Sequence, residues 1–311
     1  MRLAILCLIV LSASGCSIKK VAMSKLGDAL AGTGTTFESD DDPDLVGESL
    51  PFALKLMESV LAESPTHAGL LLATASGFTE YSYAFVGQRA EQAFTENLEE
   101  SNALRARSRR LYLRARAYGL RALEVRYPGF NSALDNHLQE ALARVKKRDV
   151  PLLYWTAAAQ GLAISASKDD PEMIAQFPAV EAFVRRALQL DPDWNEGALP
   201  EFLINLEAAK SGTTAADRQI HMKSFYEQAL RLSGGTRASL FVSYAENAAI
   251  PTQNRAQFRD LLERALHVDP DQHPEMRLAN LLAQRRARWL LGRTDDLFLE
   301  GPAPAGKGEV K

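Results

Sequence analysis

Almost every segment of this chain repeats apolar residues with the 3.6-residue period of an α-helix. Ile18, Val21, Leu26 and Leu30, for example, share one face of a helix in the first such segment. Proline or glycine separates the periodic segments and begins or ends the helices. No run of alternating β-branched residues predicts a strand. The sequence therefore predicts an all-α protein.

The segment boundaries give a set of expected helices. We expect a short helix over 18–30 and another that begins at Asp42-Pro43, is kinked by Pro51 and ends at Ser64-Pro65. The total is roughly 11–13 helices. The remaining helices are expected over 66–86, 88–126, 132–146, 150–166, 171–190, 195–210, 214–233, 236–248, 252–267 and 274–298.

A weak internal repeat underlies the expected helices, in which an apolar pair ends a helix and proline or glycine follows. The pairs begin at Val60, Ala122, Ala187, Ala229 and Ala265, at intervals of 62, 65, 42 and 36 residues. The last two intervals approach the period of about 34 residues of tetratricopeptide helix pairs. The first two leave room for two helix pairs or for insertions. The pattern resembles a degenerate tetratricopeptide-like solenoid, whose stacked pairs leave a concave surface that binds proteins or peptides.

The first seventeen residues predict an export signal that ends in an acceptor cysteine. Arg2 precedes an apolar run, Leu3–Leu11, which is shorter than the roughly 20 residues of a membrane-spanning helix. Ala13-Ser14-Gly15-Cys16 resembles a bacterial lipobox, with Ala13 where leucine is usual. We expect a signal peptide over 1–15, acylation of Cys16, an all-α domain over 16–299 and a flexible tail over 300–311. A plain secretory signal and an N-terminal membrane anchor are the alternatives.

Charge and cysteine content argue against a nucleic-acid partner and a disulfide framework. Removing residues 1–15 leaves 35 Lys and Arg against 39 Asp and Glu, a net charge near −4. Cys7 lies in the signal segment and Cys16 would be acylated, so no thiol would remain free. The arginines from Arg105 to Arg126 are interpreted as a solvated helix face balanced by the acids of 91–100, with anionic headgroups or an acidic partner as the alternative.

No sequence motif predicts catalysis, a cofactor or a metal site. Asp191–Gly197 resembles a calcium loop, but Glu196 stands where glycine is needed and Phe202 where a bidentate glutamate is needed. A second polar cluster is interpreted as solvated turn residues rather than metal ligands: His267, Asp269, Asp271 and His273. The sequence contains no serine-hydrolase, zinc-protease or phosphate-loop motif. We expect a protein that is not an enzyme.

Three constellations are candidates for ligand or partner binding. Tyr154 and Trp155 begin a helix rich in small residues, and form either aromatic core or a ligand wall. Asn280, Gln284 and Arg286 share a helix and could point toward a cleft. Acidic, amide and tyrosine side chains also interrupt mainly apolar helices, where they must find hydrogen-bond partners or face a cavity. These are Glu201, Asn205, Tyr244 and Glu246.

Six segments, in this order, resemble the T-component lipoproteins of tripartite ATP-independent periplasmic (TRAP) transporters. They are Cys16–Lys20, Ser39–Pro43, Pro51–Leu56, Pro151–Trp155, Ser167–Pro171 and Ala279–Ala287. The resemblance extends from Cys16 to about Leu299. It implies a periplasmic, tetratricopeptide-like helical protein that associates with the solute-binding subunit, can form trimers and holds an apolar ligand in an internal channel or cleft. It assigns no contact residue in this chain.

Together these patterns predict a lipid-anchored, non-enzymatic accessory of secondary transport. Its expected partners are the solute-binding subunit, the membrane and further copies of itself. Ser17, which follows the acylated cysteine, favours the outer membrane. The alternative function is a tetratricopeptide-type lipoprotein scaffold for cell-envelope assembly.

Overall fold

The computed structural model describes residues 22–32 and 34–299, and within these residues it contains helices and no strands, which confirms the all-α prediction. The signal segment, Cys16 and the tail over 300–311 lie outside the described residues. The chain divides into two compact units: unit 1 includes residues 42–192 and the segment up to Phe37, and unit 2 includes 38–41 and the residues from Asp193. No described helix combines the length and apolar character needed to cross a membrane.

Unit 1 begins with helical residues 22–31, α2 (Gly34–Glu38, whose last residue belongs to unit 2) and α3 (Pro43–Glu63). Asp42 is the N-cap of α3, because its Oδ1 accepts hydrogen bonds at 3.0 Å from the backbone N–H groups of Asp44 and Leu45. The helix runs through Pro51 as one element and buries Leu54, Met57 and Leu61, among others. The predicted helix start is therefore confirmed.

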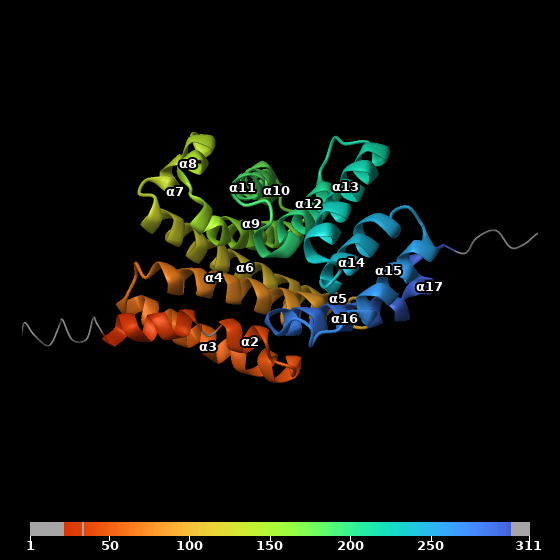
Figure 1. Cartoon of the computed structure of the whole chain (residues 1–311), viewed down its shortest axis with the longest axis horizontal. Helices are drawn as coiled ribbons and strands as arrows, with labels where there is room; N and C mark the ends of the chain where they lie inside the picture. Colours follow the sequence, from red (N-terminus) through yellow and green to blue (C-terminus); the bar gives the residue numbers. More distant parts are fainter. Residues whose placement is uncertain (1–21, 33, 300–311) are drawn as a thin grey trace, which may run out of the picture. The chain divides into compact units, whose positions relative to one another are not determined.

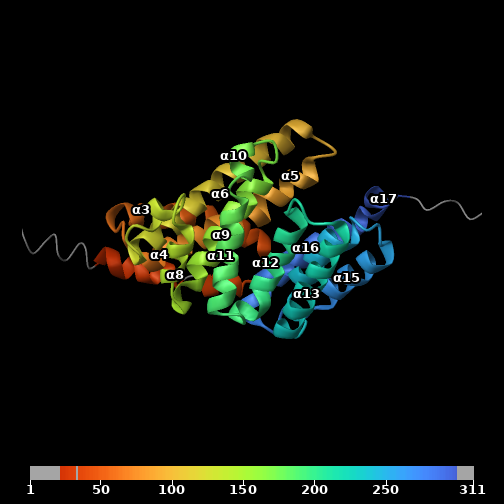
Figure 2. The same cartoon turned by 90° about the horizontal axis from the view of Figure 1, so that it is seen from above.

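A long hairpin follows in unit 1. It consists of α4 (Ala68–Tyr81), the π-helix η1 (Ser82–Gly87), α5 (Gln88–Ala93) and α6 (Leu98–Arg126). Figure 2 shows the α5–α6 end of this hairpin reaching away from α3 and α4. The prediction of a single helix over 88–126 is wrong, since Asn97 starts a new helix by accepting a 3.0 Å hydrogen bond from the Glu100 N–H.

The rest of unit 1 is a second hairpin with short insertions. Its elements are α7 (Phe130–Ala133), α8 (Leu138–Arg144), η2 (Lys147–Asp149), α9 (Val150–Ser165), α10 (Pro171–Ile174) and α11 (Phe177–Leu190). The expected helices over 132–146 and 171–190 are each divided in two. The long helix α9 packs against α4, α6 and α11 and is buried on most of its surface.

Unit 2 is a series of helix pairs followed by a last single helix, which can be followed in Figure 1. Its elements are η3 (Trp194–Gly197), α12 (Ala198–Ala209), α13 (Ala215–Ser233), α14 (Ala238–Tyr244), the π-helix η4 (Ala245–Ala249), α15 (Arg255–His267), η5 (Pro274–Met276), α16 (Arg277–Gly292) and α17 (Thr294–Leu297). Helix α12 packs against α13, α14 and η4, and α14 packs against α15 and α16. Phe241, Phe258 and Leu262 are buried in the core between the helices.

The apolar pairs of the sequence repeat lie at the ends of the second helices of the pairs. They end α3, α6 and α11 in unit 1 and α13 and α15 in unit 2, and their first residues are all buried. The two long intervals contain insertions, namely η1 and α5 in one and α7, α8 and α10 in the other, rather than additional pairs. The structure thus decides between the alternatives that the spacing left open.

Candidate functional site

The first helices of the pairs in unit 2 carry a row of polar side chains, which we call the polar row: Asn205 on α12, Ser243 on α14, Glu246 and Asn247 on η4, and Arg286 on α16. Asn205 Oδ1 accepts hydrogen bonds from Ser243 Oγ at 3.3 Å and from Asn247 Nδ2 at 3.0 Å. Asn205 is exposed and Asn247 is half-buried. These amides therefore join two neighbouring first helices at the surface.

A buried ion pair continues the polar row. Both Nε and Nη2 of Arg286 donate to Glu246 Oε1, at 3.2 and 2.5 Å, and the Arg286 guanidinium lies 4.4 Å from the Trp289 ring centroid. The Arg286 side chain is 9% exposed and that of Glu246 is 25% exposed. Charge pairing and the aromatic face together make burial of the guanidinium tolerable.

Glu246 lies in the π-helix η4. A π-helix contains an extra residue in the turn, and such turns often occur at functional sites. Here the widened turn comes directly after Tyr244, which is buried and stacks on Tyr226 with a centroid distance of 4.2 Å. Burial, followed by the negative charge that Tyr226 and Glu227 would contribute, raises the pKa of Tyr244. Tyr244 is therefore a neutral core residue beside the polar row.

Three other predicted residues hold neighbouring helices together inside unit 2. Asn280 Oδ1 accepts from the Ala238 N–H at 3.0 Å, while Asn280 Nδ2 donates to the Thr236 carbonyl at 3.0 Å. Gln284 Nε2 donates to the carbonyl groups at the end of α15, the shortest bond being 2.7 Å to Val268. Glu201 Oε2 accepts from Arg237 Nε at 2.9 Å. Asn280 and Gln284 thus cap helix ends, and Glu201 forms an ion pair between helices. All three have hydrogen-bond partners, which is one of the alternatives that the sequence left open for polar residues in apolar helices.

The aromatic pair lies in unit 1. Tyr154 and Trp155 stand at the start of α9, are half-buried, and pack edge to face with their centroids 5.0 Å apart. Further along α9, the side-chain amide of Gln160 is buried and forms no hydrogen bond with any described residue. The unit thus contains aromatic and amide groups that could contact a small organic molecule.

The positive charges of the arginine-rich helix α6 are balanced by other acidic residues than those predicted. We expected the acids upstream of it to balance these charges, but the partners of its arginines come largely from other helices of unit 1. Arg109 pairs with Asp170 at 2.5 Å, and Arg114 lies 3.5 Å from Glu58. Since these contacts fix several arginines against neighbouring elements, they serve to join the helices of unit 1.

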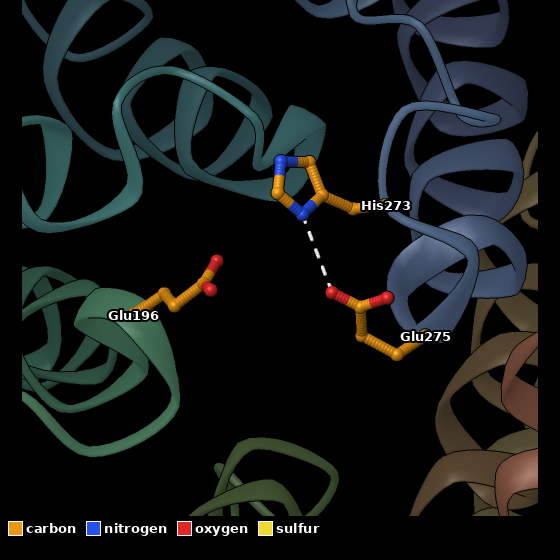
Figure 3. Close-up of side chains that lie close together, drawn as sticks. All are labelled: Glu196, His273 and Glu275. Atoms are coloured by element: carbon orange, nitrogen blue, oxygen red, sulfur yellow. Dashed lines mark hydrogen bonds and ion pairs between the residues drawn. The ribbon is translucent and has the colours of Figure 1, made fainter.

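A second cluster lies at the surface of unit 2, and Figure 3 shows it. Glu196 on η3, His273 just before η5 and Glu275 on η5 each offer one ligand atom, and the three atoms lie within 4.8 Å of one another. His273 Nδ1 is 3.2 Å from Glu275 Oε1. The backbone N–H of Glu275 and the His273 side chain lower the pKa of the Glu275 carboxyl.

The sequence placed Glu196 and His273 in two different clusters and did not connect them. The other members of those clusters have other partners: Asp191 pairs with Lys147 at 3.0 Å, Asp271 pairs with Arg277 at 2.8 Å, and His267 Nδ1 contacts the Glu263 carbonyl oxygen at 2.7 Å. Glu275 was not predicted at all. Only the fold brings segments this far apart in the chain together.

The lipidation candidate Cys16 lies outside the described residues, so its modification stays a prediction.

Comparison with known proteins agrees with the resemblance seen in the sequence. The chain is 32% identical over 305 residues to an uncharacterized protein of Treponema pallidum (strain Nichols), an alignment that covers 92% of this chain and 94% of the relative. Residues 39–298 match the family described as TRAP transporter T-component. This match includes most of both units, so the chain belongs to the TRAP transporter T-component family and has an accessory role in a TRAP transporter.

Proposed function

We propose that this protein is a periplasmic, lipid-anchored T-component that binds the solute-binding subunit of its transporter through the polar row of unit 2. The observation that carries this proposal is the line of polar groups from Asn205 through Asn247 and Glu246 to Arg286, which crosses three consecutive first helices. In stacked helix pairs, the first helices form the surface that receives a protein partner.

The chemistry of the row fits a polar protein surface. Asn205 is exposed, and Asn205 Oδ1 has a second amide as its neighbour, so a partner's backbone or side-chain groups can exchange hydrogen bonds with both. The buried Arg286–Glu246 pair anchors the row and would contribute little contact itself. Binding of this kind would be reversible, as an accessory subunit that meets a soluble partner requires.

The experiment measures binding of the purified solute-binding subunit to the mature protein by surface plasmon resonance. Asn205→Leu and Asn247→Leu should each weaken binding at least tenfold, because a partner's polar groups would lose their hydrogen bonds. Lys223→Ala is the matched control, since Lys223 lies on the second helix α13 of the same unit and pairs only loosely with Glu227, at 3.8 Å. Absence of binding by the unmodified protein would refute the proposal that it binds the solute-binding subunit. Unchanged binding by both leucine variants would refute the proposal that the polar row is the binding surface.

The proposal includes membrane attachment through Cys16 and Ser17. Several acyl chains on one cysteine hold a protein firmly at a membrane, whereas a single chain binds only marginally. Cys16→Ser should move the protein from the membrane to the soluble periplasmic fraction while its helical melting transition remains. Density-gradient separation of the two membranes tests the expected outer-membrane location. Recovery of the Cys16→Ser variant in the membrane would contradict the lipid anchor.

We extend the proposal to a small apolar ligand near Tyr154 and Trp155 and to a homotrimer. The half-buried aromatic pair supports the first, and the family resemblance motivates the second. Native mass spectrometry tests both, since it resolves subunit number and bound small molecules in one measurement. Trp155→Ala should remove a bound ligand without changing the oligomeric state.

A further inference from the structure

We propose that Glu196, His273 and Glu275 bind a zinc ion that joins the loop before α12 to the loop before α16. The three side chains offer one nitrogen and two carboxylate oxygens, all within 4.8 Å of one another. This donor set is one that Zn²⁺ accepts, with water completing a four-coordinate shell. The site is separate from the polar row, and the inference does not depend on the proposed function.

The spacing of two of the three ligand atoms is about 0.1 Å short of the range that tetrahedral zinc requires. Zinc bonds of about 2.0–2.2 Å at a tetrahedral angle place two ligand atoms roughly 3.3–3.6 Å apart. His273 Nδ1 and Glu275 Oε1 are 3.2 Å apart. Figure 3 shows the Glu196 carboxylate facing this pair across a short gap. Because Glu196 is exposed, a rotation of its side chain can close that gap.

The charge balance of the cluster favours a cation. Within the described part of the chain, Glu196 forms no ion pair, and Glu275 pairs with His273 and with no lysine or arginine. Two arginines near these loops have carboxylate partners outside the cluster: Arg237, at the start of α14, pairs with Glu201, and Arg277, at the start of α16, pairs with Asp271. A divalent cation would neutralise the two carboxylates that the cluster brings together with His273 within 4.8 Å.

Buried contacts hold both loops in place. On the η3 side, Arg237 Nη1 donates to the Asn195 carbonyl at 3.3 Å. Gly197, with a φ of +96°, packs closely against α13, because an added Cβ would lie only 3.0 Å from the Ala229 backbone. On the η5 side, Asn280 at the start of α16 is hydrogen-bonded to Ala238. Since the loops are anchored, the ion needs to order only side chains, which lowers the entropic cost of binding.

The donor set discriminates between metal ions. Ca²⁺ prefers six to eight oxygen ligands, and Mg²⁺ prefers octahedral oxygen coordination and keeps several waters. A site with one imidazole and two carboxylates suits zinc better, as imidazole is a typical ligand of zinc and other transition metals. A bound ion would connect η3 with the start of η5, two segments of unit 2 that are distant in sequence, so it should raise the melting temperature of that unit.

The test is isothermal titration calorimetry of the untagged mature protein with ZnCl₂, together with thermal melts in Zn²⁺, Ca²⁺ or Mg²⁺. We expect one zinc ion per chain, a higher melting temperature in zinc and no comparable change in calcium or magnesium. Glu196→Gln and His273→Gln should each weaken zinc binding at least tenfold. His221→Gln is the matched control, since His221 Nδ1 also lies near a glutamate, 3.1 Å from Glu207 Oε1, but in a pair to which the described part of the chain adds no third ligand.

Each result of these measurements either supports or overturns the proposed zinc site. Circular dichroism establishes that each variant is folded, which the exposed position of Glu196 and the half-buried position of His273 favour. Retained zinc binding in both Glu196→Gln and His273→Gln, or its loss in His221→Gln, would overturn the proposed site. Absence of saturable zinc binding by the unmodified protein would overturn it as well. None of these results affects the binding test for the solute-binding subunit.

Discussion

Replacing Gly119 by alanine should destabilise unit 1, because this glycine allows α6 and α9 to cross closely. A Cβ at position 119 would lie 2.2 Å from Thr156 Oγ1, 3.1 Å from Thr156 Cβ and 3.3 Å from Thr156 Cα. Rotating the threonine side chain removes the first contact and leaves the other two. That rotation would also break the 2.6 Å hydrogen bond from Thr156 Oγ1 to the Leu152 carbonyl.

The size of the effect follows from opposing contributions to the free energy of unfolding. Alanine is favoured over glycine within a helix by about 1 kcal/mol. Overpacking a well-packed contact costs about 1–3 kcal/mol, and the lost hydrogen bond costs about 1 kcal/mol. The sum is a loss of about 1–3 kcal/mol. For a unit of this size, such a loss lowers the melting temperature by about 2–12 °C.

Thermal and urea denaturation followed by circular dichroism measure this change. Gly292→Ala is the matched control, since a Cβ there meets no atom within 4 Å, and we expect it to be neutral or slightly stabilising. Thr156→Ala should partly rescue Gly119→Ala, so a double-mutant cycle gives a favourable coupling of about 0.5 kcal/mol or more. A Gly119→Ala protein as stable as the unmodified chain would show that the helix crossing is not close-packed.

Three further predictions concern polar contacts. Asn280→Ala should cost about 2–3 kcal/mol of unfolding free energy, since it leaves the buried Ala238 N–H without its side-chain acceptor. Urea denaturation of this variant against the unmodified chain measures the loss. Glu246→Leu should cost about 3–5 kcal/mol by removing the carboxylate that pairs with the buried Arg286 cation, and Arg286→Met in the same chain should recover most of that loss. Burial alone would raise the pKa of Glu58, but hydrogen bonds from its neighbours and the charge of nearby arginine lower it overall. A lowered folded-state pKa gives stability that is present above the ordinary pKa of 4.5 and is lost as the pH falls below it, so Glu58→Gln should flatten the acid limb of a stability–pH curve.

The periodicity of the sequence was sufficient to predict most of the fold. An N-cap side chain such as that of Asp42 or Asn97 accepts hydrogen bonds from backbone N–H groups no more than three residues further along the chain. A helix start can therefore be predicted from a short stretch of sequence. The Asn97 start was nevertheless missed, because the apolar rhythm continues on both sides of it. The sequence also did not decide whether the long intervals of unit 1 contain an added helix pair or insertions. An interval near twice the repeat period can hold either one more helix pair or several short helices.

The candidate site was harder to predict than the fold, because burial alone does not say what a polar side chain does. Asn280 and Glu246 both interrupt apolar helices in the sequence. In the structure Asn280 is 1% exposed and caps a neighbouring helix, whereas Glu246 pairs with Arg286 beside the exposed amides of the polar row. The difference arises from contacts between helices that are distant in sequence.

Those contacts nevertheless follow a rule that the sequence repeat contains. In unit 2, Glu201 and Arg237 are 36 residues apart, Asn205 and Ser243 are 38 apart, Glu246 and Arg286 are 40 apart, and Ala238 and Asn280 are 42 apart. The repeat intervals over this part of the chain are 42 and 36 residues. Equivalent positions of neighbouring pairs face each other when the pairs stack, so their side chains meet at separations close to one repeat. Glu196 and His273 are 77 residues apart, close to the sum of those two intervals, so the metal cluster joins positions two repeats apart. Polar residues that recur at one or two periods of such a repeat should therefore mark the contacts between its helix pairs from the amino-acid sequence alone.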